Sequence, residues 1–162
     1  MRGKRPTSDV PGYMIAQVAA GVLAAILVLF MKGDAKISAM AFERGALVPL
    51  LAEFLGTLRA CFVVLNAATA KANSNNLFYG LAIGFTALAS AFSLGGYSGG
   101  AFNPAVAVGI TAMGLNAVGN IRIHLIGELA GGAVAAVTFR FVSPDDIQRA
   151  VVSPPDRPTR TN

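Results

Sequence analysis

The chain has 162 residues, of which 54% are hydrophobic and only 13% are charged, and its mean hydropathy is +0.61. This balance lies far outside that of a soluble domain and indicates that most of the chain lies in lipid. The net charge of +5 could suit nucleic acid, but the basic residues flank apolar segments and form no stripe with interleaved aromatics. We therefore expect a lipid bilayer and no nucleic acid as partner.

The sequence has few side chains that could take part in catalysis or bind a metal. The lone Cys61 cannot form a disulfide within the chain, and the lone His124 has no second histidine or thiolate with which to bind a metal. No nucleophile with a base and no paired acid and base appears in the sequence. We therefore expect no enzyme, no metal and no cofactor.

Four apolar stretches approach or reach the length of about 20 residues that a helix needs to cross a bilayer. The start "MRGKR" could belong to a signal peptide, but the polar "PTSDVPGY" follows it and the next apolar run is long, which favours a retained span. The sequence predicts an all-α membrane protein, with an N-terminal segment 1–11, a membrane domain 12–142 and a proline-rich disordered tail 143–162. The four predicted spans are 12–31, 46–66, 77–94 and 121–142.

Lys and Arg are distributed unevenly between the two predicted sides of the membrane. Eight lie on the side of the termini and four on the opposite side. Because cytoplasmic loops are enriched in Lys and Arg, we expect a multi-pass protein of the cell membrane with both termini in the cytoplasm.

The first and last spans resemble each other. Residues 13–26 align without gaps on residues 124–137 at a constant offset of 111, and the polar residues Gln17 and Glu128 coincide. Two apolar helices rich in small residues could also look alike by composition alone. A true repeat would place its copies in opposite directions across the membrane, as in inverted-repeat transporters.

The segment "GGYSGGAFNPAVAVG" interrupts the third apolar region. Asn103 is a favoured helix cap and Pro104 a favoured first helical residue, so a helix is predicted over 103–113. At about 16 Å it would enter the membrane without crossing it. The preceding glycine segment, 95–101, is predicted to be extended and to line a water-accessible wall, because unpaired carbonyls are too costly in lipid.

This wall would offer carbonyl oxygens of Gly99, Gly100 and Ala101 as acceptors and the Asn103 amide as a donor. Together they could replace the hydrogen bonds of water or of a small polyol. The amino end of the half-helix carries partial positive charge, which opposes the entry of cations and protons.

"SGGAFNPAVAVG", together with "AEFLGT" at 52–57 and "YMIAQ" at 13–17, resembles the major intrinsic protein family of aquaporins and glycerol facilitators. The resemblance implies a passive channel for water or small neutral solutes such as glycerol, and a homotetramer. It also implies a second Asn-Pro-Ala half-helix, whose repeat position falls before Met1. We therefore expect a partial aquaporin-like fold of four spans and one re-entrant half-helix, truncated at its N-terminus by two helices and the first half-helix.

The resemblance also assigns roles to single residues. Ala91 and Val106 would lie at the pore constriction, making it wider and less polar than that of a strict water channel, although both could simply pack. Glu53 would brace the re-entrant loop by accepting backbone N–H bonds. Arg59 departs from the family, whose usual residue there is apolar; because a mid-span charge is costly in lipid, it would pair with a carboxylate of a neighbouring helix or subunit, or mark a decaying sequence. The implied pore-lining residues are Asn103, Pro104, Ala105, Val106, Ala91, Gly99, Gly100 and Ala101.

The alternative function is a non-conducting membrane protein, either a truncated relic or an accessory subunit. Such a protein would keep the fold but lack half of the pore.

Overall fold

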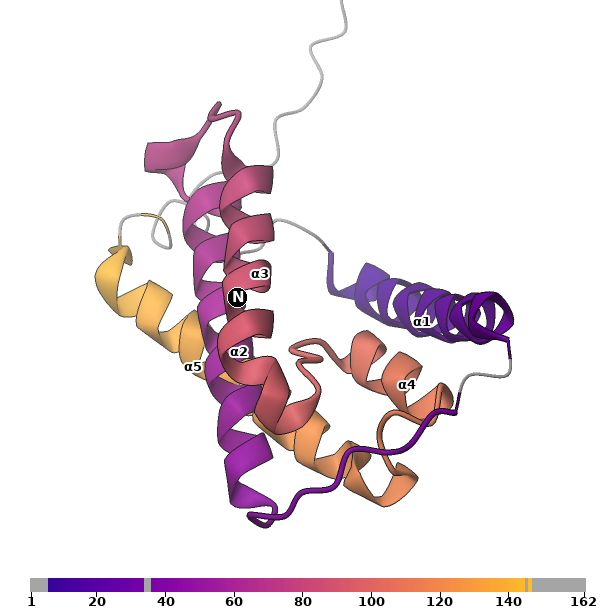
Figure 1. Ribbon diagram of the computed structural model, residues 1–162. Helices are drawn as coiled ribbons and strands as arrows, with labels where there is room; N and C mark the ends of the chain where they lie inside the picture. Colours follow the sequence, from indigo (N-terminus) through magenta and orange to yellow (C-terminus); the bar gives the residue numbers. More distant parts are fainter. Residues whose placement is uncertain (1–5, 34–35, 145, 147–162) are drawn as a thin grey trace, which may run out of the picture.

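The computed structural model describes residues 6–33, 36–144 and 146, and within them the chain is helical without strands. Four helices are long and apolar enough to cross a membrane, and a fifth, α4, is short. The predicted fold class, an all-α membrane protein, is confirmed (Figure 1). The helices are α1 (Val10–Lys32), α2 (Leu47–Val64), α3 (Tyr79–Ser98), α4 (Pro104–Ala112) and α5 (Ile121–Val142).

The glycine segment differs from its prediction. We expected the third span to end at residue 94 and the chain to be extended from Gly95, yet α3 continues through Gly95 and Gly96 to Ser98. Each helical glycine costs only about 1 kcal/mol relative to alanine, which tertiary contacts readily offset. Here the returning chain packs against the helix, because a Cβ at Gly100 would lie 3.2 Å from the Cα of Gly95. Glycine in this stretch therefore serves close packing as well as the turn.

The other boundaries shift by small amounts. Helix α1 begins two residues before the predicted start, and α2 is prolonged beyond residue 66 by a π-helical turn, Leu65–Thr69. The Asn66 side chain donates to the Phe62 carbonyl, and the Asn76 side chain donates to the Ala67 carbonyl, which fastens the following connector. Most of the predicted disordered tail lies outside the described residues; the Asp146 carboxylate accepts a hydrogen bond from the Lys71 N–H.

Helices α2 and α5 pack through glycine. A Cβ at Gly131 would lie 2.5 Å from the Phe54 carbonyl oxygen, and one at Gly127 would lie 2.8 Å from that of Leu50. Such contact between helix backbones is how small residues drive packing in membranes. Helix α3 packs on α2 as well, so that α2 is shared by both neighbours.

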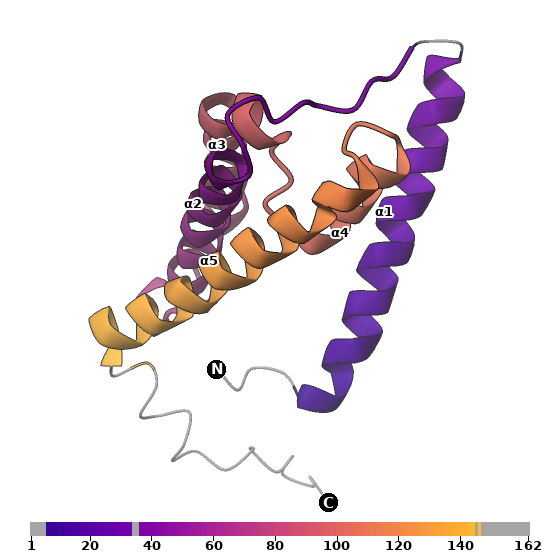
Figure 2. The ribbon, with the colours of Figure 1, turned by 90° about the horizontal axis from the view of Figure 1, so that it is seen from below.

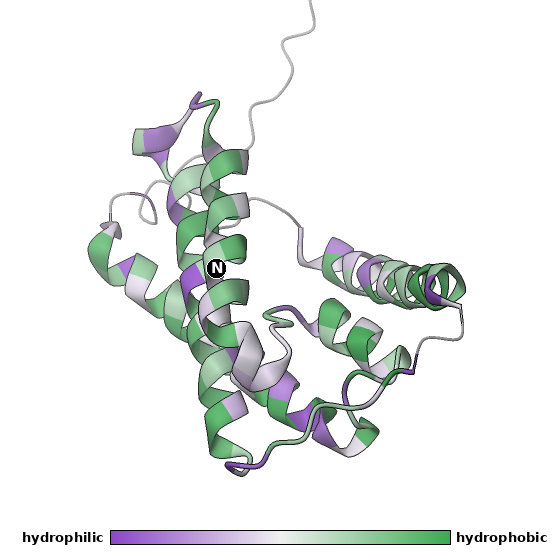
Figure 3. Ribbon diagram, in the orientation of Figure 1, coloured by the Kyte–Doolittle hydropathy of each residue, from purple (hydrophilic) through white to green (hydrophobic). Residues whose placement is uncertain are grey.

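Helix α1 stands apart from this bundle and packs against α4 instead (Figure 2). A Cβ at Gly21 would lie 2.5 Å from the Ala105 carbonyl oxygen, so the two helices touch through their backbones. Outside this contact α1 is largely exposed, with Ala25 its one buried residue. Hydrophobic residues make up most of the long helices (Figure 3), as expected for helices that face lipid or another helix.

Candidate functional site

The site is the turn between α3 and α4, where the chain reverses direction. Gly99 and Gly100 adopt φ of 92° and 67°, which glycine tolerates without a steric penalty, and Phe102 follows at φ 50°. Asn103 is extended, and its side-chain oxygen accepts the Ala105 N–H at 2.9 Å. Pro104 occupies the first helical position, so local chemistry starts α4 here. With nine residues, α4 is about 14 Å long, roughly half of a bilayer core.

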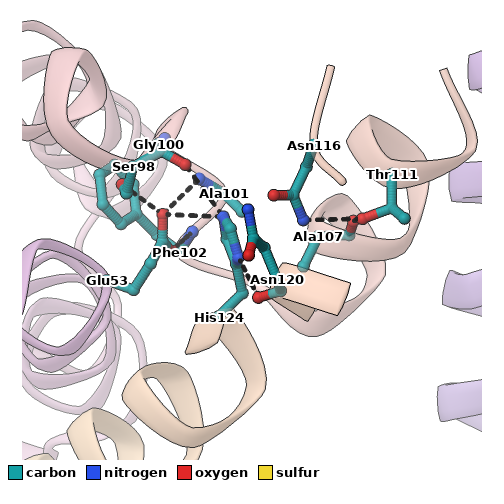
Figure 4. Close-up of polar contacts among 10 residues, drawn as sticks. All are labelled: Glu53, Ser98, Gly100, Ala101, Phe102, Ala107, Thr111, Asn116, Asn120 and His124. Atoms are coloured by element: carbon teal, nitrogen blue, oxygen red, sulfur yellow. Dashed lines mark hydrogen bonds and ion pairs between the residues drawn. The ribbon is translucent and has the colours of Figure 1, made fainter. Parts of the chain in front are cut away.

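Glu53 of α2 holds this turn in place (Figure 4). Its fully buried carboxylate accepts three hydrogen bonds, from the Ser98 hydroxyl at 2.6 Å, the Ala101 N–H at 3.1 Å and the Phe102 N–H at 2.6 Å. Glu53 follows Leu47 by six residues, so it lies about 9 Å along the helix from that end. The turn is thereby fixed inside the span and not at its surface.

His124 of α5 supports the same turn from another side. Its Nε2 lies 2.9 Å from the Ser98 carbonyl oxygen and its Nδ1 lies 3.3 Å from that of Asn120. A carbonyl oxygen can only accept, so the 2.9 Å contact with Ser98 requires a proton on Nε2. The same nitrogen lies 3.8 Å from a Glu53 oxygen. The helix α5 thus fixes the end of α3 through an imidazole that is fully buried.

Glu128 is a second buried carboxylate, one turn of α5 beyond His124 and 2% exposed. It lies beside the backbone N–H of Asn103 and the Glu53 carboxyl group. Neither of its oxygens has a hydrogen-bond partner among the described residues. The start of α4 therefore faces acidic groups from α2 and α5.

A groove of about 660 Å³ opens beside the turn. No hydrogen bond among the described residues ends on the carbonyls of Gly99 and Gly100, which line this groove, so these acceptors are unpaired there. The Asn103 side chain is exposed and uses its oxygen for the cap, which leaves its amide N–H groups as donors. The groove is lined by residues 38–41 of the α1–α2 connector and by Ala91, Gly95, Gly99, Gly100, Ile110 and Leu115.

The structure brings only some of the predicted site residues to this groove. Ala91, Gly99 and Gly100 line it, whereas Ala101 and Ala105 are buried. Val106 is 43% exposed and lines a separate cavity of about 150 Å³ between α1 and α4, so it does not share a groove with Ala91. At the start of α4, Asn103 is exposed and Pro104 is half-buried, and neither lines this groove.

Sequence reasoning missed the polar residues that position the half-helix. These residues are Ser98, His124 and Asn116. The Asn116 side chain donates to the Thr111 hydroxyl at 3.0 Å, and that hydroxyl donates to the Ala107 carbonyl (Figure 4). Polar side chains inside apolar segments need partners, and this was the available signal. The Met40 N–H also donates to the Leu115 carbonyl, which ties the end of the half-helix to the α1–α2 connector.

Comparison with known proteins agrees with this geometry. The family model described as major intrinsic protein matches residues 2–139. Probable aquaporin TIP2-2 of Oryza sativa subsp. japonica is 33% identical over 80% of this chain and 52% of its own length. Aquaporin Z of Brucella melitensis biotype 1 is 36% identical over 57% of this chain and 42% of its own length.

The chain therefore spans about half the length of the curated relatives it matches. No solved structure matches the chain. The family match covers α1, α2, α3, the re-entrant turn, the half-helix and α5 up to Phe139, which is most of the chain. The chain belongs to the major intrinsic protein family.

Proposed function

We propose that this chain forms part of the wall of a passive transmembrane channel for water or small neutral solutes. The observation that carries the proposal is the braced turn: Glu53 holds Ala101 and Phe102 inside the span, so that free carbonyls and a helix start lie at membrane depth. Irregular backbone at such depth is tolerated where it is buried in protein or lines a wet cavity. The family match and the similarity to two proteins named aquaporins support the same reading.

Selectivity for neutral solutes has two physical supports. The amino end of α4 points its partial positive charge at the turn, which disfavours cations and protons. Ala91 presents a single methyl group to the groove, so this wall leaves room for solutes larger than water. We therefore extend the proposal to solutes of the size of glycerol.

The test is osmotic. Vesicles containing the chain are mixed with impermeant sugar or with glycerol in a stopped-flow instrument, and their shrinkage or swelling is compared with that of empty vesicles. The proposal predicts faster volume change with the chain. Ala91→Leu, which narrows the groove, should lower the rate toward that of empty vesicles, whereas Ala89→Leu, an equal change at an exposed position outside the lining of the groove, should leave it unchanged.

Vesicles that respond no faster than empty ones would contradict conduction by this chain and favour the non-conducting alternative. A further expectation from the family is a homotetramer, which photobleaching steps of single labelled complexes would count. The Lys and Arg distribution supports the cell membrane with cytoplasmic termini, which protease accessibility in intact cells would test.

A further inference from the structure

Arg59 lies near the middle of a membrane span. Helix α2 and its π-helical turn form one apolar segment, Leu47–Thr69. Arg59 is about 18 Å along the axis from Leu47 and about 15 Å from Thr69. Long basic side chains reach the headgroups from helix ends, but not from such a depth. The guanidinium must therefore be satisfied inside the membrane.

The chain itself satisfies this cation only in part. Nε and Nη2 of Arg59 both donate to the Ser90 hydroxyl oxygen, at 3.2 and 2.7 Å, and that buried hydroxyl donates to the Thr86 carbonyl. A guanidinium has five N–H donors, so a single neutral acceptor leaves most of them unused. Among the described residues no carboxylate lies within ion-pair distance of the Arg59 guanidinium.

Arg59 also lines a groove between α2 and α3 of about 440 Å³. This α2–α3 groove shares no lining residue with the one beside the re-entrant turn. Apart from Arg59 and Ser93 its walls are apolar, and it follows the seam of two helices, the usual setting for a third helix with one polar anchor. Its lining residues are Leu55, Leu58, Arg59, Phe62, Val63, Ser93 and Leu94.

We propose that the α2–α3 groove binds a transmembrane helix from outside this 162-residue chain, with an Asp or Glu side chain placed opposite Arg59. A carboxylate supplies the missing charge and acceptors in one group, in the fork geometry that a guanidinium favours. A second copy of the chain does not supply it at this depth, because Glu53 and Glu128, the carboxylates away from the ends of its described spans, are 0% and 2% exposed, and Asp9 lies at the end of the first span. Lipid phosphates lie at the membrane surface, away from Arg59.

The proposal is tested with designed peptides. The full chain, carrying a donor fluorophore on an N-terminal tag, is reconstituted in phosphatidylcholine vesicles with an acceptor-labelled Leu/Ala transmembrane peptide that has one central Glu or, as control, one central Gln. Energy transfer should report association about tenfold tighter for the Glu peptide, the scale of one polar contact between membrane helices. Arg59→Leu should abolish the preference and Arg59→Lys should keep part of it. Phe85→Leu, an exposed α3 change outside the groove, should preserve it in full.

Three outcomes would overturn the proposal. Equal association of the Glu and Gln peptides with the unaltered chain would show that charge does not select the occupant. Energy transfer between two copies of the chain that depends on Arg59 would assign the groove to self-association. Loss of the Glu preference on adding phosphatidylglycerol would make a lipid phosphate the counter-ion. Matching circular dichroism spectra for all variants ensure that a negative result reflects the groove and not misfolding.

Discussion

Replacing Glu53 by glutamine probes the brace with little change of shape. The carboxylate oxygen Oε1 accepts from Ser98 and Ala101, and Oε2 accepts from the Phe102 N–H at 2.6 Å. In Glu53→Gln the remaining oxygen can keep the first pair, but the amide nitrogen then faces the Phe102 N–H. One hydrogen bond to a charged group is lost, which costs about 1.5–3 kcal/mol, and the other two weaken. We expect a total cost of about 3 kcal/mol.

Hydrogen exchange of the reconstituted protein measures this cost locally. A loss of about 3 kcal/mol corresponds to exchange at the Ala101 and Phe102 amides that is faster by about two orders of magnitude. Glu43→Gln, an exposed change in the α1–α2 connector, serves as the matched control and should alter protection little. Unchanged protection at both amides in a folded Glu53→Gln protein would refute the bracing role.

Three further changes test packing, capping and the mid-span charge. Gly131→Ala should lower the free energy of unfolding by about 1–3 kcal/mol in detergent denaturation, because the added Cβ meets the Phe54 carbonyl. The matched Gly12→Ala has open space around its Cβ and should not lower it. Equal effects of the two changes would contradict the packing argument. Asn103→Ala should cost about 1 kcal/mol in the same assay through the lost cap, and a neutral result would mean that the hydrogen bond to Ala105 is dispensable. Arg59→Leu should favour membrane insertion by about 3 kcal/mol when no partner helix is present, measured as the inserted fraction in a translation assay, and unchanged insertion would show that Arg59 is already compensated.

Most of the helical architecture could be predicted from local features of the sequence. Four apolar runs of sufficient length predict the long helices, since a span needs only length and hydropathy. Asn103 and Pro104 act within one turn of their own position, so the start of α4 follows from their capping chemistry. Such features need no knowledge of distant residues.

Features that depend on distant contacts could not be predicted in the same way. Gly95 and Gly96 indicate a break when taken alone, but close packing of Gly100 against Gly95 keeps both in α3. The sequence alone excludes His124 as a metal ligand but does not predict its structural role, because its partner, the Ser98 carbonyl, is 26 positions away in sequence. The separation of Val106 from the groove beside Ala91 likewise follows from the way α1 packs on α4.

The central claim is that the chain turns back inside the membrane at a point that water can reach. A spin label on Asn103→Cys, in a Cys61→Ser background, measures both properties in vesicles, with Leu77→Cys, an exposed position just before α3, as the surface reference. We expect the label to lie about 9 Å or more below the membrane surface at which α2 begins, at Leu47, and still to collide with a water-soluble nickel chelate. A label at the depth of the Leu77 reference, or one buried and reached only by oxygen, would contradict it.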